Sequence, residues 1–353
     1  MIYPKIPLAQ SIIELCLAKG VTQIIISPGS RNAPLTIGFT NNPAFTCYSI
    51  ADERCAGFFA LGIAQQTQKP TALVCTSGSA LLNYYPAFAE AFYSEIPLIV
   101  ISADRPSDKI DIGDGQTIRQ VNVFENHSLY NANLDENASE ENDVKINEAI
   151  NLALTQKGPV HINAPFEEPL YQTVAELSVK PKVVTVVEID NNFEINDSTI
   201  DIWNSAKKKL VLIGVNNPYQ IDQSVVDFFA NDPSVLVMTE TISNVHHPTF
   251  LNNIDTIITP FDENDFKAFQ PDLLITLGGM LVSKRIKAFL RNYKPANHWH
   301  IDPLRAYDTF GCLTHHFEVK PNAFFKKIIT NASPIKSDYF DKGQAVKKIR
   351  EEK

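Results

Sequence analysis

Short apolar runs separated by helical patterns dominate the first half of the chain and constrain its fold most strongly. The runs have the length of buried strands and read VTQIIIS (21–27), TALVC (71–75), LIVIS (98–102) and GPVHINAP (158–165). Apolar residues recur at helical spacing between them, as in the stretch from Ala9 to Leu17, which Gly20 stops. Buried strands alternating with helices predict a doubly wound α/β domain with a mainly parallel sheet.

The stretch from Ser178 to Ser198 breaks this alternation with Pro181, a VVTVV run and the polar IDNNFEINDS. Strand-like and helical segments then resume, the strand-like ones being KLVLIG (209–214), SVLVMTE (234–240), DLLITLGG (272–279) and HWHID (298–302). The sequence therefore predicts two α/β domains, at residues 1–180 and 195–335. The charged end, residues 336–353, is expected to be a charged helix or linker that leads onward to a further domain.

Composition excludes several classes of protein. The net charge of −9, without a long basic run, argues against nucleic acid as a partner. The apolar runs are too short to span a bilayer, and the first residues lack the pattern of a secretory signal. Cysteines without paired spacing favour core thiols in a reducing cytoplasm over disulfides or a metal site; they are Cys16, Cys47, Cys55, Cys75 and Cys312.

Polar residues follow the first strand at the point where open α/β sheets bind ligands. The segment IIISPGSRNAPL places Ser30 and Arg31 directly after a buried strand and the turn at Pro28 and Gly29. The planar guanidinium of Arg31 can clamp a carboxylate, and the Ser30 hydroxyl can add a hydrogen bond. The alternative is a tight turn whose arginine is merely solvated.

A second strand ends near Ile50, and Asp52 and Glu53 open the helix that follows. Acidic residues in a first turn are commonly partners of the helix dipole. The functional alternative is that the Glu53 carboxylate, half-buried at a strand–helix junction, shares a proton with a ring nitrogen of a ligand.

Two further strand ends carry polar groups. After TALVC, a turn of small residues at 77–79 can present backbone N–H groups to a ligand, or can simply allow close packing. After LIVIS, the segment SADRP brings Arg105, and the loop IGDGQTIRQ (112–120) brings Gln116 and Arg119. Each of these is by itself compatible with an ordinary surface residue.

These polar residues together are more specific evidence for a functional site than any one of them alone. Three strand ends are expected to deliver Arg31, Glu53 and Arg105 to one edge of the sheet. Two guanidinium groups and one carboxylate suit an anionic substrate beside a cofactor that must gain or lose a proton.

The motifs SPGSRNAPL, ADER-AGFFALG, TSGSALLNYYPA-AEA, SADRP and GQTIRQ together resemble a family of thiamine-diphosphate enzymes of menaquinone biosynthesis, the 2-succinyl-5-enolpyruvyl-6-hydroxy-3-cyclohexene-1-carboxylate (SEPHCHC) synthases. The resemblance is strong over residues 5–125 and weaker beyond. It implies a pyrimidine-binding domain, then a Rossmann-like middle domain without cofactor. A third domain that binds the diphosphate and Mg²⁺ or Mn²⁺ has no counterpart here. Asp114 and its flanking glycines mimic that domain's metal motif but lack the preceding buried strand.

The resemblance also assigns roles to individual residues. Glu53 matches the glutamate that activates the cofactor through its aminopyrimidine ring. The loop near the pyrimidine corresponds to Ser77, Gly78 and Ser79, and the positions that bind isochorismate correspond to Ser30, Arg31, Arg105 and Gln116. The family often has an asparagine before the glutamine of the substrate loop, whereas this chain has Gly115.

The implied reaction is decarboxylation of 2-oxoglutarate and addition of the succinyl carbanion to isochorismate, in a cytoplasmic homodimer or homotetramer. The resemblance further implies that this chain by itself holds the cofactor weakly and does not turn over. The alternatives are another thiamine-diphosphate carboligase, such as an acetolactate-synthase-like enzyme, and a non-catalytic metabolite-binding α/β protein.

Two other patterns in the second half favour structural interpretations. Adjacent histidines, His246-His247 and His315-His316, face different ways on a strand or helix, which disfavours a shared metal. The glycines after two strands, at 214 and 278–279, do not form a full dinucleotide fingerprint and are interpreted as a relic of the fold.

Overall fold

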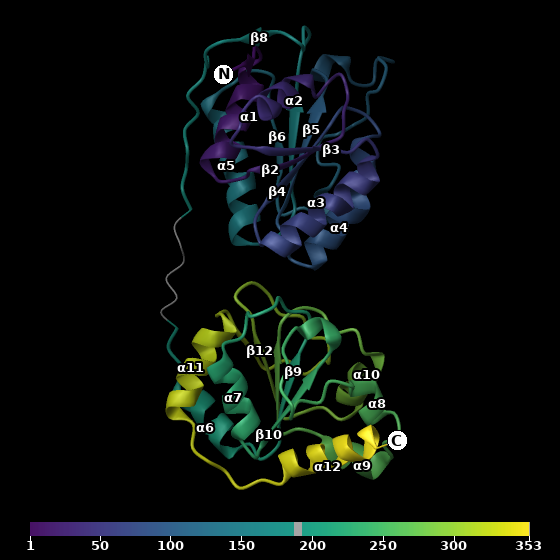
Figure 1. Cartoon of the computed structure of the whole chain (residues 1–353), viewed down its shortest axis with the longest axis vertical. Coiled ribbons are helices and arrows are strands. Elements are labelled where there is room, and N and C mark those ends of the chain that lie inside the picture. Colours follow the sequence, from purple (N-terminus) through teal and green to yellow (C-terminus); the bar gives the residue numbers. More distant parts are fainter. Residues whose placement is uncertain (187–192, 353) are drawn as a thin grey trace. The chain divides into compact units, whose positions relative to one another are not determined.

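The computed structural model describes residues 1–186 and 193–352 (Figure 1). The chain divides into two compact units, Met1–Glu188 and Ile189–Lys353. Both are α/β units with parallel sheets, so the predicted fold class is confirmed. Within the described ranges, no helix is long and apolar enough to cross a membrane.

The first unit contains a six-stranded sheet of order β3-β2-β4-β5-β7-β6, and every pairing in it is parallel. The strands are β2 (Gln23–Ile26), β3 (Thr46–Ser49), β4 (Thr71–Cys75), β5 (Leu98–Asp104), β6 (Asn131–Asn133) and β7 (Val160–Pro165). A separate antiparallel pair, β1 (Tyr3–Pro4) and β8 (Thr173–Val174), lies outside this sheet and was not expected from the sequence.

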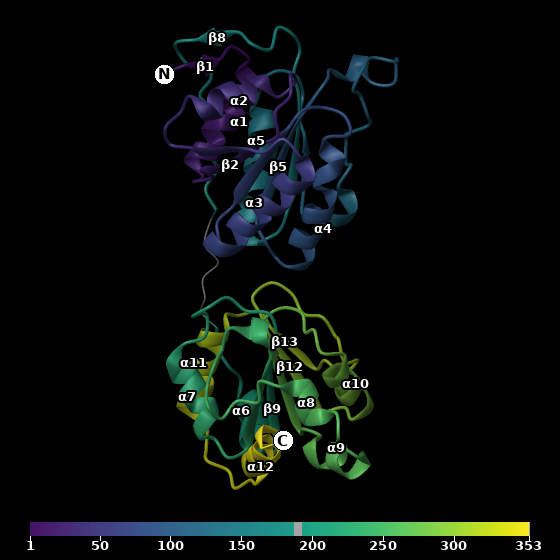
Figure 2. The ribbon, with the colours of Figure 1, turned by 45° about the vertical axis from the view of Figure 1, so that its right-hand side comes forward.

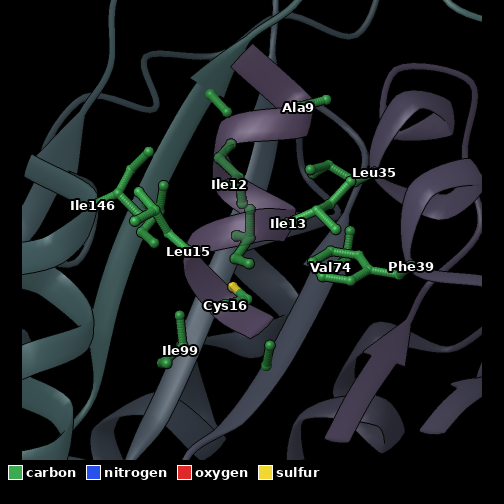
Figure 3. Close-up of a cluster of buried hydrophobic side chains, with 14 of the residues drawn as sticks. Ala9, Ile12, Ile13, Leu15, Cys16, Leu35, Phe39, Val74, Ile99 and Ile146 are labelled. Atoms are coloured by element: carbon green, nitrogen blue, oxygen red, sulfur yellow. The ribbon is translucent and has the colours of Figure 1, made fainter. Parts of the chain in front are cut away.

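Helices cover both faces of this sheet (Figure 2). One face packs against α1 (Pro7–Ala18), α2 (Ala33–Thr40) and α5 (Glu140–Thr155), and the other against α3 (Glu53–Thr67), the short helix η1 (Leu81–Tyr84) and α4 (Tyr85–Tyr93). The apolar stripe predicted on α1 enters the first of these cores, where it meets Leu35, Phe39, Val74, Ile99 and Ile146 (Figure 3).

The second unit contains a five-stranded parallel sheet of order β10-β9-β11-β12-β13. Its strands are β9 (Lys209–Ile213), β10 (Val235–Thr239), β11 (Leu273–Leu277), β12 (Asn297–Ile301) and β13 (His315–Phe317). One face packs against α6 (Asp197–Ser205), α7 (Gln223–Asn231) and α11 (Pro321–Asn331). The other packs against α8 (Ile254–Ile258), α9 (Glu263–Phe269), α10 (Lys284–Asn292) and α12 (Tyr339–Glu351).

Helix α12 lies within residues 336–353, which the sequence predicts to be a charged helix or linker, but its packing against the second unit was not predicted. Its residues Tyr339 and Gly343 are buried one helical turn apart. The Tyr339 hydroxyl donates to the Phe269 carbonyl at 2.8 Å, and Gly343 lies so close to Leu236 that an added Cβ would be 2.2 Å from it. Few of its side chains are buried, and most of the others are polar or charged, which explains why the sequence pattern does not reveal this packing.

The crevice between β9 and β11, where an open sheet of this order would bind a ligand, is closed by backbone contact. Gly214 N–H donates to the Leu277 carbonyl at 2.9 Å, and Gly279 N–H donates to the Val215 carbonyl at 2.7 Å. A Cβ on Gly214 would lie 2.0 Å from the Gly279 carbonyl oxygen. Gly214 and Gly279, which were interpreted from the sequence as a relic of a nucleotide-binding fold, therefore let two loops pack directly on each other.

The N-terminus of α10 is also occupied by the chain itself. Backbone N–H groups at a helix start attract anions such as phosphate. Here the Glu240 carboxylate accepts from Val282 N–H at 2.9 Å and from Ser283 N–H at 2.6 Å. At the carboxyl edge of the second sheet, the chain's own backbone and the Glu240 side chain therefore fill these two potential ligand positions.

We expect Gly214→Ala to destabilise the second unit by about 1–3 kcal/mol or more, because the new methyl group meets a backbone atom that cannot move cheaply. Urea unfolding followed by tryptophan fluorescence measures this, since Trp203 and Trp299 are the only tryptophans and both lie in this unit. As a control, Gly62→Ala in α3 has open space and should not destabilise. An unchanged midpoint for Gly214→Ala would contradict the close approach.

Candidate functional site

The predicted site residues lie along the carboxyl edge of the first sheet. In spatial order, β3 leads to Glu53, β2 to Ser30 and Arg31, β4 to the turn 77–79, and β5 to Arg105. A shared edge was predicted from the sequence, and the parallel pairing places these segments there. The two arginines come from strands that are separated by β4, so the turn 77–79 lies between them.

Glu53 is the first residue of α3, whose start is fixed by the neighbouring Asp52 side chain, which accepts from Cys55 N–H at 2.9 Å. The Glu53 side chain is half-buried, and no group in the described residues donates a hydrogen bond to its carboxylate. Burial raises the pKa of the Cys75 thiol, and the Glu53 charge adds to that increase, which locates the carboxylate near the end of β4. Its lone pairs are therefore available to a ligand.

Arg31 is buried, with 9% of its surface exposed, and is not the solvated turn residue of the alternative interpretation. Its Nη1 donates to the Phe166 carbonyl at 2.9 Å, just after β7. Its Nη2 lies 3.4 Å from the Glu168 carboxylate, whose side chain is 69% exposed. Gly29 allows this turn to approach β4, since a Cβ there would be 2.4 Å from Thr76.

Arg105 joins the turn after β4 to the loop 112–120. Its Nη1 donates to the buried Ser77 hydroxyl at 2.7 Å and to the Gln116 carbonyl at 2.9 Å. Its Nε lies 3.2 Å from the Asp114 carboxylate, an ion-pair distance, but the orientation leaves this buried N–H without a hydrogen bond. The carboxylate that mimics a metal motif in the sequence is thus a neighbour of Arg105.

Of the remaining predicted residues, Gly78 is buried and the others are exposed. Gln116 contributes its backbone carbonyl to Arg105 and has φ +56°, while its side chain is exposed. Ser30 and Ser79 also lie at the surface, with hydroxyl groups that bond to nothing in the described chain. Arg119, whose side chain is 83% exposed, pairs with Asp111 at 2.8 Å. The sheet edge therefore combines two guanidinium groups that are held by hydrogen bonds with several polar side chains that have no hydrogen-bond partner in the described chain.

Sequence reasoning missed a buried polar network behind this edge, formed by Ser102, Asp104, Gln120, His161 and Asn163. All five side chains are buried. Burial raises the pKa of the Asp104 carboxyl, although the Asn163 hydrogen bond and the charges of both arginines oppose the increase. Burial lowers the pKa of His161 to about 3. The signal in the sequence was the pair of polar residues inside the otherwise apolar strand VHINAP.

The second unit offers two cavities, and no predicted site residue lines either of them. One, of about 620 Å³, lies among Lys207, Lys208, Lys336 and Lys342, and the other, of about 330 Å³, lies beside His246 and His247. In the described part of the chain, no group of three or more histidine, cysteine or acidic side chains is placed to hold a metal ion.

Comparison with known proteins finds a matching family and similar sequences. Residues 6–127 match the family "Thiamine pyrophosphate enzyme, N-terminal TPP binding domain". A SEPHCHC synthase of Flavobacterium psychrophilum is 69% identical over 353 residues, which cover 100% of this chain and 64% of the relative. The SEPHCHC synthase of Flavobacterium johnsoniae is 67% identical over 353 residues, which cover 99% of this chain and 64% of the relative.

More distant relatives carry the same name. The SEPHCHC synthase of Porphyromonas gingivalis is 40% identical over 325 residues, covering 90% of this chain and 56% of the relative. The chain thus spans less than two thirds of the length of these relatives. Its sequence is similar over nearly its whole length to proteins named SEPHCHC synthase, and its residues 6–127 match the N-terminal domain of thiamine pyrophosphate enzymes.

Proposed function

We propose that the first unit supplies the aminopyrimidine side of a thiamine-diphosphate site and part of an isochorismate site. The activity proposed for the whole protein is decarboxylation of 2-oxoglutarate and addition of the succinyl unit to isochorismate. The observation that carries the proposal is the Glu53 carboxylate, half-buried at the sheet edge and without a hydrogen-bond donor among the described residues. The names of the relatives support the substrates.

The residues present fit the cofactor. An aminopyrimidine ring offers a nitrogen that can share a proton with a carboxylate, and Glu53 has free lone pairs at the head of α3. Ser77, Gly78 and Ser79, in the turn after β4, are the proposed neighbours of the ring. When bound, thiamine diphosphate supplies the carbon nucleophile and the electron sink that decarboxylation of a 2-oxo acid needs. Glu53 holds the proton at the ring nitrogen, and the sheet edge fixes its position.

Arg31 and Arg105 suit a substrate that carries carboxylates, because a planar guanidinium binds a carboxylate through paired N–H groups. Each guanidinium already has a solvent-exposed carboxylate beside it: Glu168 at 3.4 Å from Arg31, and Asp114 at 3.2 Å from Arg105. Exposed ion pairs of this kind contribute little stability. We propose that the carboxylates of isochorismate replace these two neighbours, with Ser30 and Gln116 adding polar contacts.

Other features belong to the proposal through the family resemblance. These are a Mg²⁺ or Mn²⁺ ion bound outside the described residues, a homodimer or homotetramer, and a cytoplasmic location. The net charge of −9 supports small anions bound at local arginines over nucleic acid as the partner.

Replacing the proposed proton-sharing carboxylate tests the central role. In a protein of the relatives' full length that contains these 353 residues, Glu53→Gln should lower kcat by about 10²-fold or more, the usual contribution of general acid–base catalysis. The measurement is release of carbon dioxide from 2-oxoglutarate in the presence of isochorismate. Glu90→Gln, the same change at an exposed site in α4, should leave kcat unchanged. Retention of activity within about tenfold by Glu53→Gln would remove the assigned role.

The arginine assignment predicts a selective loss of affinity. Arg105→Lys keeps the charge but loses the fork, so KM for isochorismate should rise by about 10- to 100-fold while KM for 2-oxoglutarate changes little. Arg119→Lys, the same substitution at an exposed pair in the neighbouring loop, should change neither constant. Consumption of pyruvate without any dependence on isochorismate would instead favour an acetolactate-synthase-like enzyme.

A further inference from the structure

Gln120 lies at the end of the loop 112–120 and is completely buried, so it cannot touch a substrate directly. Its side-chain Oε1 accepts from Gly78 N–H at 2.8 Å. Its Nε2 donates to Asn163 Oδ1 at 2.8 Å, with the Ala103 carbonyl at 3.3 Å. One carboxamide therefore connects the substrate loop to the turn after β4 and to the ends of β5 and β7.

The contact that Gln120 secures is a tight one. Gly78 has φ +92°, and a Cβ on it would lie 3.0 Å from the Gln116 carbonyl oxygen. The backbone of the turn and that of the loop thus lie against each other. Two side chains hold this approach: Arg105 bonds to Ser77 and to the Gln116 carbonyl, and Gln120 bonds to Gly78 N–H from the interior.

The network behind Gln120 fixes which way its amide points. His161 is neutral near pH 7 because burial lowers its pKa to about 3. The Ser102 hydroxyl donates to Asn163 Oδ1 at 2.8 Å, so the His161 Nε2–H, also 2.8 Å away, donates to Ser102 Oγ. Gly78 N–H can only donate, so Gln120 turns its oxygen to Gly78 and offers its NH₂ group to Asn163 Oδ1.

The same network reaches Arg105 through Asp104. The Asp104 carboxylate accepts from Asn163 Nδ2 at 2.9 Å and from Arg105 backbone N–H at 2.8 Å. Both partners are donors, so an acceptor-only side chain is needed at this position. The interior side of the sheet edge is thus connected from Gln120 through Asn163 to the residue that carries the substrate-binding guanidinium.

We propose that Gln120 is a positioning residue that sets the distance between the 77–79 turn and the Gln116 loop, and with it the geometry of Arg105 toward isochorismate. This inference rests on the proposed function, since it assumes that Arg105 and Gln116 bind that substrate. Its structural part, the anchoring of Gly78 N–H, stands independently of any activity.

The anchoring is tested on the 353-residue chain by amide hydrogen exchange. Gln120→Met has nearly the same volume but lacks the acceptor, so exchange at Gly78 N–H should become at least about tenfold faster, as expected for a lost buried hydrogen bond. Gln66→Met, the same change at an exposed site in α3, should leave Gly78 protected. Protection of Gly78 that survives in Gln120→Met would overturn the inference.

The positioning role is tested in a protein of the relatives' full length. Gln120→Met should raise KM for isochorismate by about tenfold while kcat and KM for 2-oxoglutarate change little. A purely structural role would instead reduce the active fraction, so that kcat falls and KM stays the same. If Arg105→Lys raises KM for isochorismate and Gln120→Met does not, the positioning inference fails and the proposed function stands. If neither variant raises it, the proposed function fails.

A second variant keeps the test informative if Gln120→Met does not fold. Gln120→Glu retains an acceptor for Gly78 N–H but loses the donor to Asn163. Because the bond to Gly78 sets the distance between the turn and the loop, this variant should keep Gly78 protected and leave KM for isochorismate nearly unchanged. A KM raised about tenfold while Gly78 stays protected would also overturn the inference.

Discussion

Parallel pairing of β3, β2, β4 and β5 is the constraint on which the candidate site depends. It ends four segments at one edge, where a carboxylate from the head of α3 and two arginines from loops can serve one ligand. The sheet brings the segments together, and specific bonds then fix their side chains. Arg31 is held by the Phe166 carbonyl, whereas Arg105 holds Ser77 and the Gln116 loop. Among the described residues no group donates a hydrogen bond to Glu53, which supports its proposed contact with a cofactor.

The sequence was most informative where its apolar periodicity was strong. The longer strands of both sheets and the edge that carries Arg31, Glu53 and Arg105 follow from runs such as TALVC and LIVIS, whereas the three-residue edge strands β6 and β13 were not predicted. The network around Gln120 could not be predicted, because its members are distant in sequence and only their shared burial shows that they belong together. The packing of helix α12 was not predicted for a related reason, since few of its residues are buried.

The two units use the same architectural position differently. At the first sheet, the carboxyl edge presents polar groups that are only partly engaged. At the second, Gly214 and Gly279 bring two loops into backbone contact, and Glu240 takes the anion position at the start of α10. The two units share a fold class, but this does not imply that both bind ligands at the carboxyl edge of the sheet. A few glycines and one carboxylate make the difference between the two edges.

The role of Glu53 is tested most directly by a structure of a protein of the relatives' full length with thiamine diphosphate bound. We expect a Glu53 carboxylate oxygen within about 2.6–3.2 Å of a nitrogen of the aminopyrimidine ring. We also expect the ring at the carboxyl edge formed by β3, β2 and β4. A cofactor bound with its ring away from that edge, or with Glu53 turned toward solvent, would show that Glu53 does not share a proton with the cofactor.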